Sequence, residues 1–278
     1  MFLPQFLGVF CLLFNLYATQ DSALQQIRAR GELRVGMAAS DDPPFSVTDN
    51  KGHLFGIDID LSKSLAKHLN VKLKIIKFKN LDELVTQLLK GKVDLCISNL
   101  SITLERAQKV NFSHPYVEVK KAILLNNKIF TQLKAREEES IASFFLRGHK
   151  LGVIRGSSYE EFARNYFPKA NLVLYDEWEP LVDDLDKGVI AAGFADELYV
   201  KRIVLFRPQG SLRYQAVVLK LPTDKVGIMV PKFHQEFLNW INTFLELRFK
   251  RLNFNDLLDF YKKNIFNKVD LNEFKHGL

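Results

Sequence analysis

Residues 93–106 read VDLCISNLSITLER, and this stretch predicts a strand, a polar turn and the start of a helix. The apolar run at 93–98 is typical of a buried strand. Thr103 is a candidate N-cap, because its side-chain oxygen can accept a hydrogen bond from a backbone N–H of the first helical turn. Arg106 then falls one turn inside the helix. From this stretch alone its guanidinium is either a ligand-binding cation or a structural group that saturates a carbonyl or an ion pair.

On both sides of this stretch, short aliphatic runs alternate with amphipathic segments. Leu61, Leu65 and Leu69 give the first helix one buried face, and Asn70 is suited to end it. The segments of the first series are 33–37, 57–69, 71–78, 81–89 and 93–98. A second series follows at 151–154, 158–166, 172–175, 180–185, 189–195 and 198–203. This alternation predicts an α/β fold with two Rossmann-like lobes.

Two extended runs, at 117–125 and 214–221, are predicted to be strands that cross between the lobes. Helices predicted at 233–249 and 255–261 would return to the first lobe. We therefore expect a signal peptide at 1–23 and the first part of lobe 1 at 24–123. Lobe 2 is expected at 124–213, and the lobe 1 return with the C-terminal helices at 214–278. A chain of 278 residues suits two lobes of ordinary size.

The region around Arg106 also carries a family motif, formed in order by Gly91, Asp94, Ser101, Thr103, Arg106, Phe112, Ser113, Pro115 and Tyr116. The agreement extends to GELRVG at 31–36, PPF at 43–45 and GIDIDL at 56–61. Over residues 24–265 the chain resembles the polar amino-acid solute-binding proteins of ABC transporters, which are bacterial extracellular solute-binding protein family 3. The resemblance implies the periplasmic-binding-protein type II fold, whose lobes close like a Venus flytrap on a ligand.

The resemblance also implies a set of ligand-binding residues in the first lobe. Arg106 would bind the carboxylate of an amino acid with two hydrogen bonds, and Ser101 would add its hydroxyl and its amide. Backbone groups of Ser98 and Asn99 would help to hold the ammonium group, and Asn99 is also a candidate for contact with the ligand side chain. Planar guanidinium groups suit this task because they match a carboxylate with two donors.

From the second lobe the resemblance adds Ser157 and Ser158, in the turn LGVIRGSS at 151–158, where an amide at a helix start approaches the carboxylate. It also adds Asp196, which would face the ammonium. A helix N-cap is the alternative role for Asp196, and one carboxylate can fill both roles.

The chain departs from the family pattern at the side-chain end of the pocket. Asp41 and Asp42 stand where an aromatic residue commonly precedes the Pro-Phe pair, and a second aromatic is missing near Leu81. Asp42 and Phe45 are therefore candidate ligand-binding residues, and the sequence does not identify the ligand group that each would contact. Asp41 or Asp42 would either pair a cationic ligand side chain or belong to a solvated acidic turn. Arg155 would favour an acidic ligand or lie at the surface.

Composition and charge limit the other function classes. The formal charge is +7, but the basic residues are dispersed among acids, so we expect no nucleic-acid partner. The six histidines show no metal-ligand spacing, so we expect neither metal nor cofactor. The first 17 residues are almost wholly apolar and lack Lys, Arg, Asp and Glu, which predicts a cleaved export signal. Cys96 would then be the remaining cysteine, and we expect it to be a buried thiol.

We therefore expect a periplasmic, monomeric solute-binding protein that captures an amino acid by hinge closure and delivers it to the membrane subunits of an ABC permease. We expect no enzymatic activity. One alternative is an exported cyclohexadienyl or arogenate dehydratase-like enzyme, with Glu197 and His114 as the residues to suspect. Another is a ligand-sensing protein that has lost transport, an idea raised by the missing aromatic residues.

Overall fold

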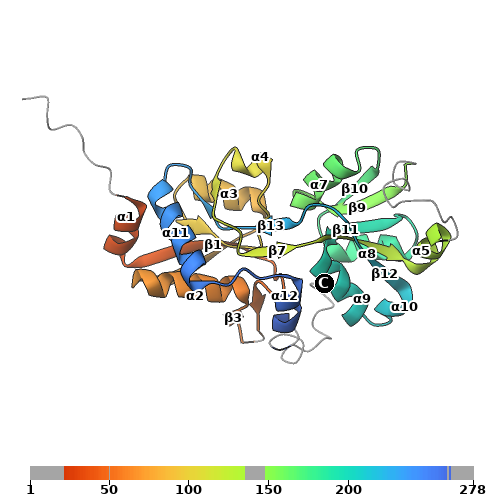
Figure 1. Ribbon diagram of the computed structural model, residues 1–278, viewed down its shortest axis with the longest axis horizontal. Helices are drawn as coiled ribbons and strands as arrows, with labels where there is room; N and C mark the ends of the chain where they lie inside the picture. Colours follow the sequence, from red (N-terminus) through yellow and green to blue (C-terminus); the bar gives the residue numbers. More distant parts are fainter. Residues whose placement is uncertain (1–21, 50, 135–147, 262, 264–278) are drawn as a thin grey trace, which may run out of the picture.

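The computed structural model describes residues 22–49, 51–134, 148–261 and 263, and it folds into two lobes joined by extended strands (Figure 1). The signal peptide predicted at 1–23 lies outside the described residues except for Ser22 and Ala23. Ser22 is the N-cap of the first helix, α1 (Ala23–Arg30), and forms a capping box with Gln25. The predicted α/β architecture of two lobes is confirmed.

The first lobe is built on a five-stranded sheet with the order β4-β1-β5-β14-β6. Its strands are β1 (Glu32–Ala38), β4 (Lys72–Phe78), β5 (Leu95–Cys96), β6 (Asn111–Phe112) and β14 (Met229–Val230). Its helices are α1, α2 (Ile57–Leu69), α3 (Leu81–Leu89), α4 (Leu104–Ala107) and α11 (Gln235–Arg248). A short hairpin of β2 (Val47–Thr48) and β3 (Leu54–Phe55) precedes α2. Because β1, β4 and β5 run parallel, their carboxyl ends lie at one edge of the lobe.

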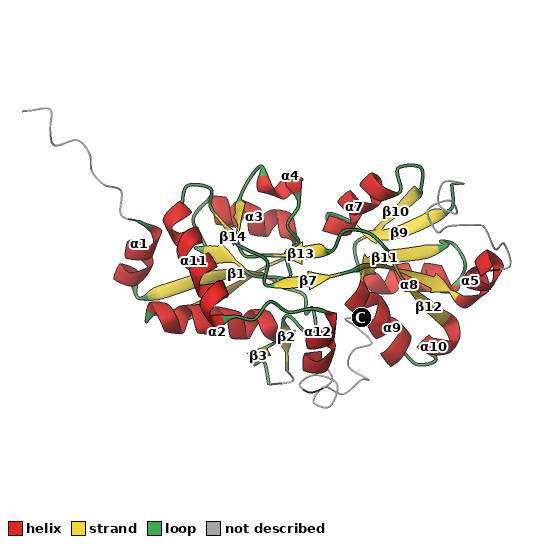
Figure 2. Cartoon of the chain, in the orientation of Figure 1, coloured by secondary structure: helices red, strands yellow, loops and turns green. Residues whose placement is uncertain are grey.

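The second lobe repeats this plan with a sheet in the order β10-β9-β11-β8-β12. Its strands are β8 (Lys121–Asn126), β9 (Lys150–Ile154), β10 (Asn171–Tyr175), β11 (Ala192–Asp196) and β12 (Tyr214–Val218). Its helices are α5 (Asn127–Lys134), α7 (Ser158–Tyr166), α8 (Trp178–Asp186), α9 (Glu197–Phe206) and α10 (Gly210–Arg213). Figure 2 shows helices and strands interleaved in both lobes.

The two lobes are linked through a two-stranded antiparallel ribbon of β7 (Val117–Val119) and β13 (Asp224–Val226). β7 leads directly into β8 of the second sheet, and β12 of that sheet leads back to β13 (Figure 1). The domain limits predicted at 123/124 and 213/214 stay predictions. Strand pairing places β8 and β12 in the second sheet. The chain therefore passes between the lobes before β8 and again after β12.

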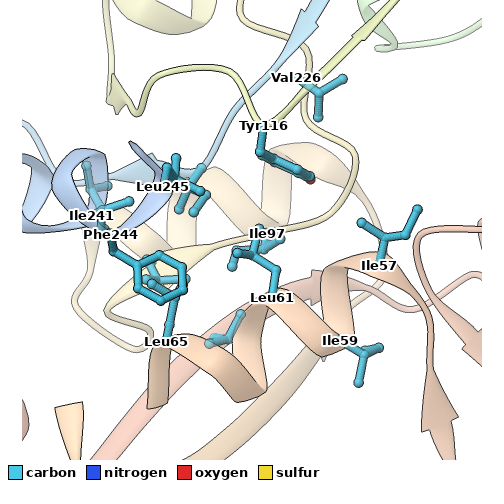
Figure 3. Packing of buried hydrophobic residues seen from close by; sticks show 14 of the residues in the cluster. Ile57, Ile59, Leu61, Leu65, Ile97, Tyr116, Val226, Ile241, Phe244 and Leu245 are labelled. Carbon is cyan, nitrogen blue, oxygen red and sulfur yellow. The ribbon is translucent and has the colours of Figure 1, made fainter. Parts of the chain in front are cut away.

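The core of the first lobe forms where α2 packs against the sheet and α11 (Figure 3). Leu61, Leu65 and Leu69 of α2 are buried, as their spacing predicts, and Asn70 ends the helix in the left-handed conformation. Burying one such leucine stabilises the fold by about 1.5–3 kcal/mol. Helix α12 (Phe254–Tyr261) contributes Leu257 to this core and also packs against α9 of the second lobe.

Gly56, at the N-cap of α2, is required by a close approach of the backbone. Its φ is 127°, and a Cβ atom there would lie 2.4 Å from the carbonyl oxygen of Phe45. Only glycine adopts this conformation without strain. The position fixes the loop at 39–46 against the start of α2, and this loop forms one side of the cleft described below.

Candidate functional site

A cleft of about 880 Å³ lies between the lobes and is lined by residues from both of them. The carboxyl ends of the parallel strands of each sheet face it, which is where open α/β sheets bind ligands. All nine residues predicted to bind a ligand line this cleft: Asp42, Phe45, Ser98, Asn99, Ser101, Arg106, Ser157, Ser158 and Asp196. The structure thus brings them together, while their individual roles in binding stay predictions.

The first-lobe wall is formed by the turn that follows β5. Ser98 accepts a hydrogen bond at its hydroxyl from the backbone N–H of Ala38, at 3.0 Å. Asn99 adopts a positive φ of 47°, and its N–H donates to a carboxylate oxygen of Asp58 at 2.8 Å. This sharp turn ends the strand early and directs the chain along the cleft.

Asp58 supports this turn from inside the lobe. Its side chain is fully buried and accepts a second hydrogen bond, from the hydroxyl of Tyr116 at 2.7 Å. Burial raises the pKa of Asp58 to about 7, against the opposing effect of the two hydrogen bonds. Asp58 therefore positions Asn99 and is itself poised to titrate near neutral pH.

Arg106 lies on α4, one turn after Thr103, whose hydroxyl accepts a hydrogen bond from the Arg106 N–H at 3.3 Å, as predicted for an N-cap. Its guanidinium donates to the carbonyl of Ser101 at 3.0 Å and reaches the carbonyl of Gly156 in the second lobe at 3.4 Å. Burial lowers the pKa of Arg106, and nearby carboxylates, Asp224 first, oppose this. The guanidinium thus lies between the lobes and still has donors in reach of the cleft.

A cluster of hydroxyl groups around Asp224 joins three parts of the protein. Asp224, on the connecting strand β13, accepts hydrogen bonds from Ser101 at 2.9 Å and from Tyr159 at 3.0 Å. The hydroxyls of Ser101 and Ser158 lie 2.8 Å apart, across the two lobes. The second carboxylate oxygen of Asp224 is buried without a hydrogen-bond partner, and burial raises the pKa of this group. Sequence reasoning missed Asp224, because a single Asp in a short strand carries no signal of this contact.

In the second-lobe wall, Asp196 fills the alternative role that the sequence allowed. It is the N-cap of α9 and accepts a hydrogen bond from the N–H of Tyr199 at 2.7 Å. Asp196 also lines the cleft, so its capping role does not prevent the predicted contact with a ligand ammonium group. Burial raises the pKa of Asp196 to about 7. Ser157 is the N-cap residue of α7, but its hydroxyl donates to the carbonyl of Ile154 at 2.7 Å.

Three aromatic residues line the cleft from the second lobe: Tyr159, which bonds to Asp224, and the pair Trp178 and Tyr199. The rings of this pair are stacked, with centroids 4.0 Å apart and an angle of 26° between the planes. Sequence reasoning considered only the first-lobe positions near Asp42 and Leu81, where the family has aromatic residues and this chain lacks them, and therefore missed the pair of Trp178 and Tyr199. The available signal was their position, because Trp178 follows β10 and Tyr199 lies three residues after Asp196.

The side-chain end of the cleft brings Asp42 together with Arg202, another residue that sequence reasoning missed. Asp42 accepts a hydrogen bond from the side-chain amide of Asn99 at 2.9 Å, and burial raises its pKa. Arg202 extends from α9, is 4% exposed, and donates to the carbonyl of Pro43 in the opposite lobe. Phe45 is also buried and contributes to both the cleft and the first-lobe core.

The two residues suspected of catalysis lie elsewhere. Neither Glu197 nor His114 lines the cleft, and Glu197 pairs with Lys201 at 2.6 Å. In the described part of the chain, no three His, Cys, Asp or Glu side chains gather as metal ligands would. No helix within the same residues has both the length and the apolar character needed to cross a membrane. Cys96 is buried, as the sequence predicts.

Comparison with known proteins matches residues 33–261 to the bacterial extracellular solute-binding proteins, family 3. The histidine-binding periplasmic protein of Salmonella typhimurium is 31% identical over 169 residues, which are 60% of this chain and 62% of that protein. The L-cystine-binding protein TcyJ of Escherichia coli is 30% identical over 64% of each chain. Both alignments thus span less than two thirds of the relative's length.

Solved structures with the same fold cover more of the chain. An ancestral amino acid-binding protein, described as a precursor of cyclohexadienyl dehydratase, has a TM-score of 0.66 and 29% identity, over 87% of this chain and 99% of that one. The arginine-bound form of a truncated ArgBP from T. maritima has a TM-score of 0.62 and 28% identity, over 80% of this chain and 98% of that one. The two-lobed fold is therefore that of type II periplasmic amino-acid binding proteins.

Proposed function

Because the chain belongs to the bacterial extracellular solute-binding proteins of family 3, we propose that it captures an amino acid by hinge closure and delivers it to an ABC permease. One observation carries the proposal. A guanidinium from the first lobe, Arg106, and a carboxylate from the second lobe, Asp196, line the same cleft. A zwitterion presents an anion and a cation at a fixed separation, so it can bridge these two groups.

At the carboxylate end, Arg106 and Ser101 of the first lobe would bind the anion together with Ser158 at the start of α7. Ser158 is the first residue of that nine-residue helix, where free backbone N–H groups favour an anion. Charge-assisted hydrogen bonds of this kind are stronger than neutral ones. The Ser101 and Ser158 hydroxyls already touch across the lobes, so a carboxylate bound to both would hold the lobes together.

At the ammonium end, Asp196 supplies the carboxylate, and Trp178 and Tyr199 supply an apolar surface beside it. A bound ammonium would favour the ionised form of Asp196 and so oppose the raised pKa that burial causes. Closure would then be driven by the ligand, because its carboxylate contacts groups of both lobes and its ammonium contacts Asp196, and the full set of contacts forms only when the lobes come together.

The proposed setting is the periplasm. The histidine-binding relative is named as a periplasmic protein, and the segment at 1–23, with its apolar run up to about residue 17, has the pattern of an export signal. We propose that this segment is cleaved, that the mature protein is a monomer, and that the permease recognises the closed form. The expected absence of enzymatic activity belongs to the same proposal.

A thermal-shift screen of the amino acids tests the proposal, followed by calorimetric titration of the best ligand. Arg106→Ala should weaken binding at least about 100-fold with the melting temperature little changed, because two hydrogen bonds to a charged group contribute about 1.5–3 kcal/mol each. Arg164→Ala, which removes an arginine paired with Glu160 outside the cleft, is the control and should bind as wild type does.

Two results would contradict this function. One is a protein that no amino acid stabilises. The other is conversion of prephenate or arogenate to an aromatic product, which would favour the dehydratase alternative. Equal affinity of wild type and the Arg106→Ala variant would leave binding in place but would refute the role of Arg106.

A further inference from the structure

Arg202 places a cation of the protein itself inside the cleft. The residue is 4% exposed, and its guanidinium carbon lies 5.1 Å from the ring centroid of Tyr199. Tyr199 in turn stacks on Trp178, so Arg202 lies next to this aromatic pair of the second-lobe wall. Its hydrogen bond to the carbonyl of Pro43 directs it towards the first lobe.

Arg202 acts on two carboxylates, one from each lobe. Burial raises the pKa of Asp42 and of Asp196, and the positive charge of Arg202 opposes this at both groups. Asp42 is also held in place by the side-chain amide of Asn99. The positive charge of Arg202 thus acts both on the acid expected to bind the ligand ammonium and on the acid at the side-chain end of the cleft.

Most of the other acidic groups around the cleft have cations beside them; Glu177, which is exposed to solvent, forms no ion pair with a described residue. Asp41 lies 3.8 Å from Lys77, Asp176 lies 2.9 Å from Arg155, and Glu179 lies 3.1 Å from Arg207. The positive charges of Lys121 and Arg106 act to lower the pKa of Asp224, against the effect of burial. Once Asp196 binds the ligand ammonium, Asp42 is the carboxylate left to balance Arg202. Beside Arg202, little negative charge then remains for a cationic ligand side chain.

We propose that Arg202 sets the charge selectivity of the cleft, so that it binds amino acids with neutral polar side chains in preference to arginine or lysine. This inference rests on the proposed function, because it concerns the side-chain end of the same site. A second cation placed beside Arg202 would be repelled in a partly desolvated cleft, where charges interact more strongly than in water. A neutral side chain of the same shape meets no such repulsion.

The test compares L-citrulline with L-arginine, which have the same length and differ in the charge of the terminal group. Calorimetry on the wild type should give at least tenfold tighter binding of citrulline. Arg202→Gln should shift the ratio of the two affinities at least tenfold towards arginine, because Asp42 loses its cation. Arg202→Lys keeps the charge and should keep the wild-type order.

A second variant makes the test independent of any folding defect in Arg202→Gln. Asp42→Asn leaves Arg202 without its balancing carboxylate, so it should shift the ratio in the opposite direction, further against arginine. Circular dichroism and melting curves check that each variant is folded.

The inference is overturned if the wild type binds arginine at least as tightly as citrulline, or if both substitutions leave the ratio unchanged. It is also overturned if the wild type binds some other amino acid but neither of these two. A wild type that binds no amino acid at all refutes the proposed function instead, so the two failures are distinguishable.

Discussion

Replacing Asp58 by asparagine should change how the stability of the protein depends on pH. Asp58 is fully buried, and its two oxygens accept hydrogen bonds from Tyr116 and from the backbone of Asn99. In its protonated form the acid can accept from Asn99 and donate to Tyr116. An asparagine can make the same two hydrogen bonds, with its oxygen accepting from Asn99 and its NH2 group donating to Tyr116, so Asp58→Asn matches the protonated acid in shape and in these two bonds, with one additional N–H.

The magnitude follows from the pKa of Asp58, which burial raises from 3.8 to about 7. A carboxyl whose pKa is higher in the folded state stabilises the fold below pH 4, and this contribution is lost as the pH rises through 7. A difference of about three pH units corresponds to on the order of 4 kcal/mol, at about 1.4 kcal/mol per unit. The asparagine variant has no such loss.

The assay is urea denaturation of wild type and Asp58→Asn between pH 4 and pH 8. At pH 4 the two free energies of unfolding should agree within about 1 kcal/mol, because both hydrogen bonds are kept. At pH 8 the variant should be the more stable by roughly 4 kcal/mol. Asp60→Asn is the control on the exposed face of the same helix and should change stability by less than about 0.5 kcal/mol. A difference between wild type and Asp58→Asn that does not vary with pH refutes the reasoning.

Three further predictions concern closure and the core. Trp178 lies in the cleft and Trp240 packs in the first-lobe core, so a ligand-induced change of tryptophan fluorescence should persist in Trp240→Phe and vanish in Trp178→Phe; the reverse pattern would exclude closure over Trp178. Ser101→Ala and Ser158→Ala should each weaken ligand binding by about 0.5–1.5 kcal/mol, and less than additively when combined, because both remove one inter-lobe contact; strict additivity in calorimetry would contradict this. Burial raises the pKa of the Cys96 thiol, so the folded mature protein should not react with a thiol reagent at pH 8 until it is denatured; rapid labelling would contradict the buried position.

Much of the fold was predictable from sequence because local signals agreed with it. The helices predicted at 57–69, 81–89 and 158–166 have these limits in the structure. Asn80 caps the second of them with its side chain, and Asn70 closes the first in a left-handed conformation. Periodic leucines and terminal polar residues are local features, and a helix needs little more.

Strand limits were less predictable, because pairing depends on distant parts of the chain. The run at 93–98 predicted one strand, yet only Leu95–Cys96 are paired, since the chain turns at Asn99 towards the cleft. The predicted strand at 189–195 begins later in the structure, at Ala192. Apolar character alone does not show where the partner strand ends.

The candidate site was predictable only in so far as the family motif carries it. The family resemblance supplied seven of the nine predicted residues that line the cleft, and the departure from the family pattern added Asp42 and Phe45. The chemistry of Arg106 and Asp196 suggested opposite ends of a zwitterion. The sequence did not predict Arg202 and Asp224 as site residues, because both are placed at the site by contacts that reach from one lobe to the other. In the sequence, Arg202 is one basic residue within an amphipathic helix, and nothing local indicates that it is buried against Pro43.

Removing the carboxylate from the ligand tests most directly whether one small molecule bridges the two lobes at its two ends. Calorimetry would compare the amino acid that stabilises the protein most with the amine left when its carboxylate is removed. Arg106→Gln should weaken binding of the amino acid at least about 100-fold and of the amine less than about threefold, whereas Asp196→Asn should weaken both. Equal losses of both ligands in Arg106→Gln would contradict a guanidinium that binds the carboxylate.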